Sequence, residues 1–210
     1  MNIKKYNTII LDCDGVIFDS NFLKIEAFRK TYDELGFSKT QIDKFVDFMK
    51  NNFGISRYKF AEYFIIEILN KKFDQMLFKN IIELYSKKSY ELYFEANFTK
   101  YLLEFLDKYK DKNLFIASGG DQKELRKVFG KRDLDKYFVD IFGSPTKKSE
   151  IVKSIVLQNE NSIMIGDAKS DMQAAKENNI DFVFMGDYST NKAMQKDTSL
   201  NSINNLGDLI

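Results

Sequence analysis

Two aspartates, Asp12 and Asp14, offer the clearest chemistry in the sequence, because they alternate directly after a short apolar run. If the chain bends where that run ends, both carboxylates project into one crevice. One carboxylate can then attack phosphorus while the other protonates the leaving oxygen. Gly15 allows a sharp turn or a close approach of the backbone at this place. Ordinary polar turns also carry Asp and Gly, so the pair alone permits both interpretations.

Two later segments offer groups that suit the same chemistry. The run Ser118-Gly119-Gly120 combines a hydroxyl with freely placed amides, which can hold a phosphoryl oxygen. Asp167 ends another apolar run, and Asp171 comes four residues later. Two carboxylates at this spacing can bind a divalent cation or its waters. Each segment also has a structural interpretation, as a glycine loop and as a favourable charge at a helix N-terminus.

A pair of lysines, Lys147 and Lys148, follows the turn at Pro145. A lysine at this place can neutralise a buried aspartate and a phosphate together. The alternative is a solvated basic pair, which is the usual state of surface lysines.

The composition excludes several other kinds of catalytic site. None of the 210 residues is histidine, and Cys13 is the one cysteine. Ser-His-Asp triads, Cys-His pairs, His-ligated or Cys₄ zinc sites and internal disulfides are therefore excluded. The remaining groups best suit a hard metal ion with oxygen ligands. A net charge of +1 does not favour nucleic acid or an anionic membrane as the main partner.

Hydrophobic and charged fractions of 44% and 30% are ordinary for a soluble globular protein. The apolar run near the N-terminus is broken at Asp12 and is too short for a signal peptide or a membrane span. We therefore expect a cytoplasmic protein. A monomer and a dimer both agree with the sequence.

Four apolar runs rich in β-forming residues are typical of buried strands, namely 6–11, 113–117, 162–165 and 181–185. Helical patterns alternate with these runs, which predicts a Rossmann-like three-layer α/β/α fold around a central parallel sheet. Ligands bind at the carboxyl ends of the strands in such sheets. The candidate residues that fall there are Asp12, Asp14, Ser118 and Asp167.

Residues 20–97 differ from the rest, because they contain no convincing strand and show helical periodicity. The first helix is predicted to bury Phe22, Ile25 and Phe28 on one face. We interpret this stretch as an insertion of three to five helices after the first strand. Residues 1–19 and 98–210 then form an α/β core domain, and residues 20–97 form a helical domain.

The order of these segments resembles that of the haloacid dehalogenase superfamily of phosphotransferases. The matching motifs are residues 12–20, residues 116–120, the segment that begins at Lys148, and Gly166-Asp167 with Asp171. The resemblance covers nearly the whole chain. The helical insertion is similar to the α-helical cap of the subgroup that contains phosphoglycolate phosphatases and phosphomutases.

The resemblance implies a magnesium-dependent phosphatase that acts on a small or medium phosphorylated metabolite. Asp12 would attack the phosphorus and form an aspartyl-phosphate. Asp14 would protonate the leaving oxygen and then activate the water that cleaves this intermediate. The Asp12 carboxylate, the Asp14 backbone carbonyl and Asp167 would hold Mg²⁺.

The resemblance assigns supporting roles to other residues. Ser118 would donate a hydrogen bond to the transferred phosphoryl group. Lys148 would balance the negative charge of the nucleophile and the phosphate, and we prefer it to Lys147 because it leads into a helix as the family's lysine does. Asp171 would orient Lys148 or a metal-bound water.

The cap usually selects the substrate in this family. Arg57 lies just past a loop at Gly54, where it would begin a cap helix and reach an anionic group of the substrate. A solvated arginine at a helix start is an equally good interpretation. Gly15 and Gly119 would complete the binding of the substrate's phosphate.

Two alternatives stay open. A phosphomutase shares the fold and the aspartate pair, although the sugar phosphomutases carry a histidine after the first motif and this chain has none. A catalytically inactive metabolite-binding protein is the alternative from another class, since fold does not fix function. A dehalogenase or a phosphonate hydrolase would not need the acid at Asp14.

Overall fold

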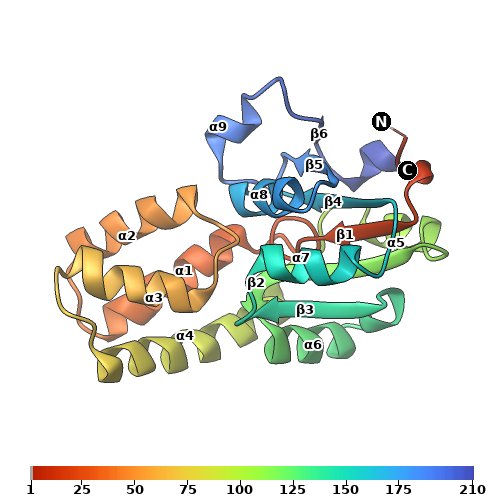
Figure 1. The fold of residues 1–210 in the computed structure, drawn as a ribbon. Coiled ribbons are helices and arrows are strands. Elements are labelled where there is room, and N and C mark those ends of the chain that lie inside the picture. The colour runs from red at the N-terminus through yellow and green to blue at the C-terminus, as the bar shows by residue number, and fades with distance from the viewer. Residues whose placement is uncertain (1) are drawn as a thin grey trace.

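A six-stranded parallel sheet forms the centre of the molecule in the computed structural model, which describes residues 2–210. The strands lie in the order β3-β2-β1-β4-β5-β6 (Figure 1). Their bounds are β1 Thr8–Leu11, β2 Asn113–Asp121, β3 Asp140–Ser144, β4 Ser162–Gly166, β5 Asp181–Met185 and β6 Ser202–Ile203. The predicted α/β fold with a central parallel sheet is confirmed.

Two strands were not predicted from the sequence. β3 pairs with β2, and the two-residue β6 pairs with β5. The sequence around β3 mixes Asp140, Gly143 and Ser144 with few apolar residues, so it lacks the continuous apolar run that marks a buried strand. Both strands lie at edges of the sheet, where such a run is not required.

Helices cover both faces of the sheet. Alternate residues of β1 point to opposite faces, so that Ile9 and Leu11 join one apolar core and Ile10 joins the other. The first core includes residues of α5 (Leu102–Lys108) and α6 (Gln122–Lys131). The second includes residues of α7 (Lys148–Val156) and α8 (Lys169–Glu177). A short helix, α9 (Lys192–Gln195), follows β5.

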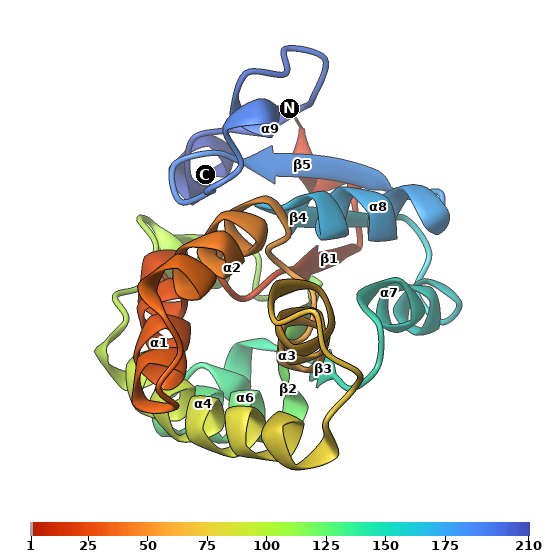
Figure 2. The ribbon, with the colours of Figure 1, turned by 90° about the vertical axis from the view of Figure 1, so that its left-hand side faces the viewer.

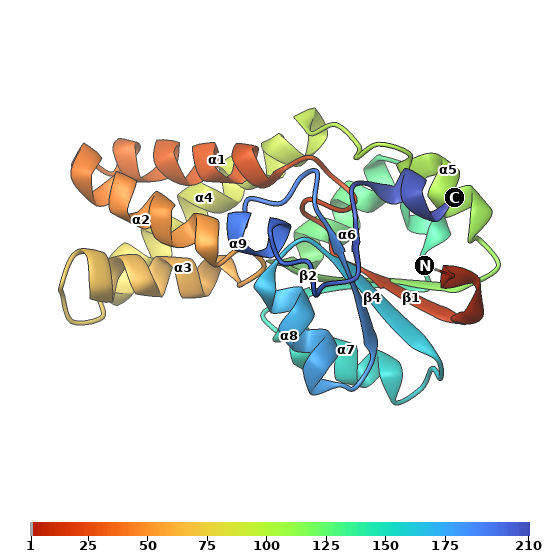
Figure 3. The ribbon, with the colours of Figure 1, turned by 90° about the horizontal axis from the view of Figure 1, so that it is seen from above.

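The predicted insertion consists of four helices and a π-helical turn. Their bounds are α1 Asn21–Glu34, α2 Lys39–Asn51, α3 Arg57–Tyr63, the π-helical turn Phe64–Ile68 and α4 Gln75–Glu95. The four helices lie together at one end of the sheet (Figures 1 and 3). Seen from that end, they stand in front of β1 and β2 (Figure 2).

Aromatic rings hold the insertion together. Phe28 stacks on Tyr85 with ring centroids 3.8 Å apart, and Tyr32 stacks on Phe64 at the same separation. Phe22, predicted to lie on the buried face of α1, is 65% exposed, and that detail is wrong. The buried face of α1 instead includes Asn21, because this end of the helix packs on polar groups of the core.

The chain passes between the sheet and the insertion through two segments that lie side by side. The Asp19 amide donates to Asn97 O over 2.9 Å, and the Thr99 amide donates to Ile17 O over 3.0 Å. The division into domains after residues 19 and 97 stays a prediction, and these hydrogen bonds lie at both of its boundaries. Within residues 2–210, none of the helices has the length and apolar character needed to cross a membrane.

Candidate active site

Three neighbouring strands bring the predicted residues together. Asp12 directly follows β1, Ser118 lies in β2 and Asp167 directly follows β4. β1 lies between the other two, with Leu11 in register with Ile116 and Ile165. The carboxyl ends of parallel strands meet at one edge of a sheet, so the three polar side chains gather there.

Lys148 joins this group from the first position of α7. Its Nζ atom lies 2.8 Å from Asp12 Oδ1 and also contacts Asp171 Oδ1. Burial lowers the pKa of Lys148, but the two carboxylates outweigh burial and the net pKa is raised. Lys147 is exposed, so the geometry favours Lys148 as the lysine of the site.

Asp12, Asp167 and Asp171 form a buried carboxylate cluster. Oxygen atoms of the three side chains lie within 4.8 Å of one another. Burial raises the pKa of Asp12 to about 7, with a further contribution from the charge of Asp171. Burial also raises the pKa of Asp167 well above its ordinary value, helped by the charge of Asp12. The cluster therefore holds more negative charge than its surroundings balance.

This cluster fits a divalent cation. Three carboxylates face one ammonium group, which leaves two negative charges when all are ionised. Within residues 2–210, Asp12 Oδ1 has no partner in full hydrogen-bond geometry, and the Lys148 ammonium lies 2.8 Å away as an ion pair. Carboxylate oxygens are the ligands that hard cations such as Mg²⁺ prefer.

Asp171 has less freedom than the other two carboxylates to bind such an ion. Its Oδ1 contacts Lys148, and its Oδ2 accepts a hydrogen bond of 3.0 Å from the Ala168 amide. Asp167 accepts a hydrogen bond of 2.6 Å at Oδ2 from Asn21, a residue of the insertion. Asp12 and Asp167 are therefore the better candidates for direct ligands, with Asp171 behind them.

Asp14 lies in a different environment from Asp12. Ser20 Oγ lies 2.6 Å and Tyr93 OH 2.9 Å from Asp14 Oδ1, and Lys24 Nζ lies 2.5 Å from Oδ2. Burial raises the pKa of Asp14, but the Lys24 ammonium and the three hydrogen bonds outweigh burial, so its net pKa is lowered. The carboxylate form of Asp14 is thus held by a cation and two hydroxyl groups.

A loop of the insertion closes over the Ser118-Gly119 segment. Gly54 has a φ angle of +88°, and a Cβ atom on it would lie 1.9 Å from Ser170 Oγ. A Cβ atom on Gly119 would lie 2.5 Å from Gly54 O. These close approaches require glycine on both sides. Ser118 Oγ accepts a hydrogen bond of 3.0 Å from the Gly120 amide, which leaves its own proton free to donate.

Gly15 is also required at its position, because its backbone passes close to the Asp167 side chain. Its φ angle is +77°, and a Cβ atom there would lie 2.5 Å from Asp167 Oδ2. The turn after Asp14 can therefore pass beside the carboxylate cluster only with glycine at this position.

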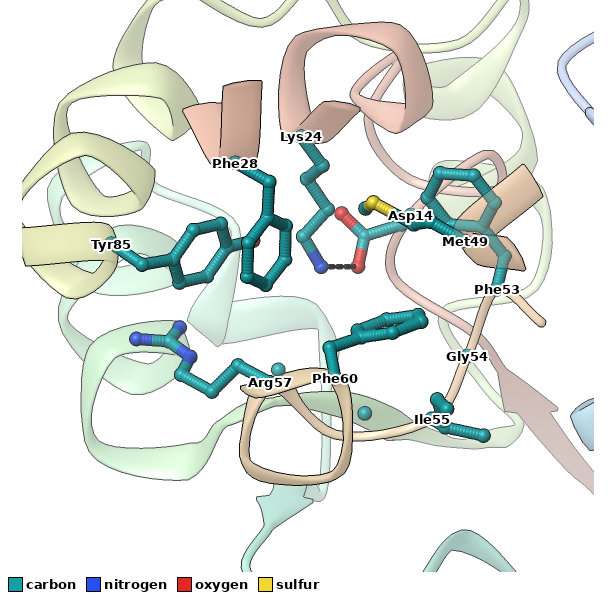
Figure 4. A pocket seen from close by; sticks show the side chains of 12 residues that line it. Asp14, Lys24, Phe28, Met49, Phe53, Gly54, Ile55, Arg57, Phe60 and Tyr85 are labelled. Atoms are coloured by element: carbon teal, nitrogen blue, oxygen red, sulfur yellow. Dashed lines mark hydrogen bonds and ion pairs between the residues drawn. The ribbon is translucent and has the colours of Figure 1, made fainter. Parts of the chain in front are cut away.

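A narrow cavity of about 20 Å³ lies between the insertion and the ends of the strands (Figure 4). The polar side chains in its wall are those of Asp14, Lys24 and Arg57. The apolar part of the wall consists of Phe28, Met49, Phe53, Ile55, Phe60 and Tyr85. A group bound there would touch Asp14 on one side and aromatic rings on the others.

Arg57 lines this cavity, but its guanidinium group is already engaged. Nη1 and Nη2 donate to the two carboxylate oxygens of Glu124 over 2.8 and 2.6 Å, and Nη1 lies 2.6 Å from Ser86 Oγ. Burial lowers the pKa of Arg57, but the Glu124 carboxylate outweighs this effect and its net pKa is raised. Arg57 thus joins α3 to α6 in this structure, and its predicted contact with a substrate stays a prediction.

A comparison with protein-family models matches residues 9–185 to the haloacid dehalogenase-like hydrolases. The chain belongs to this family. The match includes Asp12, Ser118, Lys148 and Asp167, and the family predicted from the sequence is confirmed.

Known relatives of this haloacid dehalogenase-like hydrolase cover most of its length. A phosphorylated carbohydrates phosphatase of Thermotoga maritima is 26% identical over 186 residues, which are 84% of this chain and 83% of the relative. A family member from Streptococcus pneumoniae has a similar structure, with a TM-score of 0.73, 17% identity and coverage of 99% and 98% of the two chains. A β-phosphoglucomutase of Clostridium difficile has a TM-score of 0.72 and 22% identity, with coverage of 98% of this chain and 93% of the mutase.

The site of this hydrolase includes four residues that the sequence did not single out: Ser20, Asn21, Lys24 and Tyr93. Three of them lie within one turn at the start of α1, and a signal for them exists in hindsight. Asn21 and Lys24 share a helical face with Ile25 and Phe28, at spacings of three and four residues. Polar residues on a buried face must have partners, and here the partners are Asp14 and Asp167.

Proposed function

We propose that this haloacid dehalogenase-like hydrolase is a magnesium-dependent phosphatase that acts on a phosphomonoester of a small or medium metabolite. The observation that supports it best is the buried group of Asp12, Lys148 and Asp167 at the strand ends, with Asp14 on the adjoining cavity. The groups needed for phosphoryl transfer thus lie together at one edge of the sheet: the nucleophile, its countercharge, a carboxylate that can bind an ion, and the acid. The carrier of the phosphate is most readily a sugar, as the name of the Thermotoga relative suggests.

In the first step the Asp12 carboxylate attacks phosphorus, and the bond from phosphorus to the leaving oxygen breaks. The substrate's phosphate brings further negative charge beside Asp14 and raises the pKa of its carboxyl group. Asp14, protonated in that complex, gives its proton to the leaving oxygen, which departs as an alcohol. Ser118 and Lys148 hold the oxygens of the transferred phosphoryl group, because their hydroxyl and ammonium groups donate to developing negative charge. Asp12 then carries the phosphoryl group as an aspartyl-phosphate.

In the second step Asp14 takes a proton from a water molecule, which attacks phosphorus and releases Asp12 and inorganic phosphate. The Asp12 carboxylate, Asp167 and the backbone carbonyl of Asp14 would hold the Mg²⁺ ion, with Asp171 behind them. The ion supplies positive charge beside the phosphoryl oxygens. The predicted cytoplasmic location is part of this proposal.

Arg57 is proposed to meet an anionic group of the substrate only if its pair with Glu124 opens. As it stands, the cavity offers the substrate aromatic rings and the Lys24 and Asp14 side chains. The cavity has room for about one water molecule in this structure, so a sugar ring would enter only if the insertion moved away from the ends of the strands.

Release of inorganic phosphate from a panel of phosphorylated sugars, polyols and amino alcohols tests the proposal. We expect release with Mg²⁺ and none after chelation with EDTA. A phosphate found at a new position of the same sugar would instead identify a phosphomutase. Binding of a phosphorylated metabolite without turnover, with and without Mg²⁺, would identify an inactive binding protein and overturn the proposal.

A further inference from the structure

The wall of the cavity between the insertion and the strand ends contains two cationic side chains, Lys24 and Arg57. Each of them already has a carboxylate partner. Lys24 Nζ lies 2.5 Å from Asp14 Oδ2, and Nη1 and Nη2 of Arg57 donate to Glu124. Within residues 2–210, this wall therefore offers no unpaired cation to an anionic group of a substrate.

The contact between Arg57 and Glu124 is bidentate and largely shielded from water. Nη1 and Nη2 donate over 2.8 and 2.6 Å to the two oxygens of one carboxylate, which is the strongest geometry for such a pair. The Arg57 side chain is 4% exposed and that of Glu124 is 21% exposed. The guanidinium group also lies 5.1 Å from the centre of the Tyr85 ring, and Figure 4 shows the two side by side. Loss of either partner would leave a buried charge without its countercharge.

The two partners belong to different parts of the molecule. Arg57 is the first residue of α3 in the insertion, whereas Glu124 lies in the first turn of α6 in the core. A substrate enters the cavity only if the insertion moves away from the strand ends, and this movement draws α3 away from α6. When the insertion closes again, Arg57 can pair either with Glu124 or with an anionic group on the substrate. One guanidinium fork holds one carboxylate, so the two compete.

We propose that Glu124 determines specificity, because it occupies Arg57 and thereby restricts the enzyme to phosphomonoesters whose leaving group is neutral. This inference rests on the proposed function. Glu124 is part of the fold and is present at every closing. A carboxylate or second phosphate on the leaving group would have to displace it, which would leave two anions beside one guanidinium. A neutral sugar or polyol leaves the pair intact, so the discrimination comes from repulsion of the wrong substrate.

Two compounds of nearly equal shape distinguish neutral from anionic leaving groups. Glycerol 3-phosphate has a hydroxymethyl group where 3-phosphoglycerate has a carboxylate, and the two are otherwise the same. Each is measured as a competitive inhibitor of the best substrate of the metabolite panel, with Mg²⁺, so neither compound needs to be hydrolysed itself. The quantity compared is the ratio of the two inhibition constants. For the unaltered protein we expect this ratio to favour glycerol 3-phosphate.

Glu124→Gln keeps the size of the side chain and removes its charge, which makes Arg57 available to another anion. We expect the ratio to shift toward 3-phosphoglycerate by about 10- to 100-fold, the range of one hydrogen-bonded contact with a charged group. The double variant Arg57→Met/Glu124→Gln removes the cation as well and should lose this shift. It thus separates binding of the carboxylate by Arg57 from mere loss of repulsion by Glu124.

Asp140→Asn is the matched control. Asp140 lies 2.7 Å from Arg126, which also belongs to α6, so this change likewise removes the carboxylate partner of an arginine. Neither residue of this pair lines the cavity. The control should leave the ratio of inhibition constants unchanged. Thermal unfolding of each variant reports whether the fold is intact.

An unchanged ratio in a folded Glu124→Gln protein would overturn the inference, and so would a shift that persists in the double variant. Equal weakening of both compounds would show that the pair only holds the insertion closed, which overturns a role in specificity. Absence of competition by 3-phosphoglycerate in Glu124→Gln would overturn it as well.

If Glu124→Gln does not fold, Glu124→Asp, which shortens the carboxylate and weakens its hold on Arg57, must show a smaller shift in the same direction. If the unaltered protein releases phosphate from no member of the panel, the proposed function fails and the inference falls with it. An active protein whose ratio does not respond to Glu124→Gln overturns the inference alone.

Discussion

Asp12 and Asp14 are two residues apart in the sequence, yet their surroundings have opposite character. Asp12 shares a buried cluster with Asp167 and Asp171, and its pKa is raised to about 7 by burial and by the charge of Asp171. Asp14 is equally buried, but Lys24 and two hydroxyl groups lower its net pKa. The side of Asp12, the proposed nucleophile, has surplus negative charge, whereas the side of Asp14, the proposed acid, is balanced by protein groups alone.

This difference in charge means that the Asp12 side needs a cation from solution, whereas the Asp14 side does not. A surplus of two negative charges can be offset by a divalent cation, and phosphate chemistry adds further negative charge there. The Asp14 side needs no such ion, because the insertion supplies its cation. Loss of a core residue should therefore affect metal binding and phosphoryl transfer, whereas loss of an insertion residue should affect proton transfer.

The largest effect expected is that of Asp12→Asn. An amide cannot form the aspartyl-phosphate, so kcat should fall at least about 1,000-fold on any substrate that the protein hydrolyses. The measurement is phosphate release at saturating substrate with Mg²⁺. Asp19→Asn, at an exposed aspartate in the same segment, is the control and should keep near-normal turnover. Substantial turnover by a folded Asp12→Asn protein would show that the nucleophile lies elsewhere.

Replacement of Lys148 comes next. Lys148→Met removes the ammonium that lies 2.8 Å from Asp12, and we expect kcat/KM to fall about 100-fold, as for other donors to a developing oxyanion. Lys147→Met removes the exposed neighbour and should change kcat/KM less than about twofold. The reverse pattern, with Lys147 essential and Lys148 dispensable, would contradict the site described above.

The two sides also differ in how well the sequence revealed them. Asp12, Ser118 and Asp167 end apolar runs that form strands, and parallel strands bring such ends together whatever the details of packing. Their meeting could therefore be predicted. Lys148 could be preferred to Lys147 only through the family resemblance, and its contact with Asp171 needed the structure.

The environment of Asp14 could not be predicted in the same way. Tyr93 lies 79 residues from Asp14, and the two meet only because α4 packs against α1. Helix periodicity reveals that the insertion is helical but not which helix ends face the sheet. Arg57 shows the same limit, since its partner Glu124 lies in α6 of the core and no sequence pattern joins them.

A third prediction concerns the negative surplus on the nucleophile's side. Mg²⁺ at 100 times its dissociation constant should stabilise the protein by about 2.7 kcal/mol, which raises Tm by about 5 to 10 °C for a chain of this size. Asp167→Asn removes one carboxylate of the cluster, so it should lose most of this gain while keeping or raising the Tm of the metal-free protein. Thermal unfolding in EDTA and in Mg²⁺ measures both quantities.

Asp187→Asn, at an exposed aspartate after β5, is the control for Asp167→Asn and should behave as the unaltered protein.

The sign of the pH dependence of Tm in EDTA gives a further check. The pKa of Asp12 is raised from 3.8 to about 7, so the folded protein keeps a proton there that the unfolded chain releases. The resulting stabilisation is complete below about pH 4 and is lost as pH rises through about 7. A Tm that rises over this interval would contradict the negative surplus.

The smallest effect expected is on the acid's side, at Tyr93. Tyr93→Phe removes a hydroxyl that lies 2.9 Å from Asp14 Oδ1 and leaves Ser20 and Lys24 in place. One hydrogen bond to a charged group contributes about 1.5 kcal/mol or more, but the remaining partners limit the loss to about 3- to 10-fold in kcat/KM for phenyl phosphate. Tyr90→Phe, three residues earlier in α4, is the matched control.

Tyr93→Phe also separates the two sides of the site. The Tyr93 hydroxyl donates to Asp14. Within residues 2–210 it has no hydrogen bond to the carboxylate cluster, so the Mg²⁺-dependent rise in Tm should be unchanged in Tyr93→Phe. Lower turnover with an unaltered response to Mg²⁺ would support separate control of the nucleophile by the core and of the acid by the insertion. A variant that loses its Mg²⁺ response would show that the two sides are coupled, since the hydroxyl would then influence ion binding through Asp14.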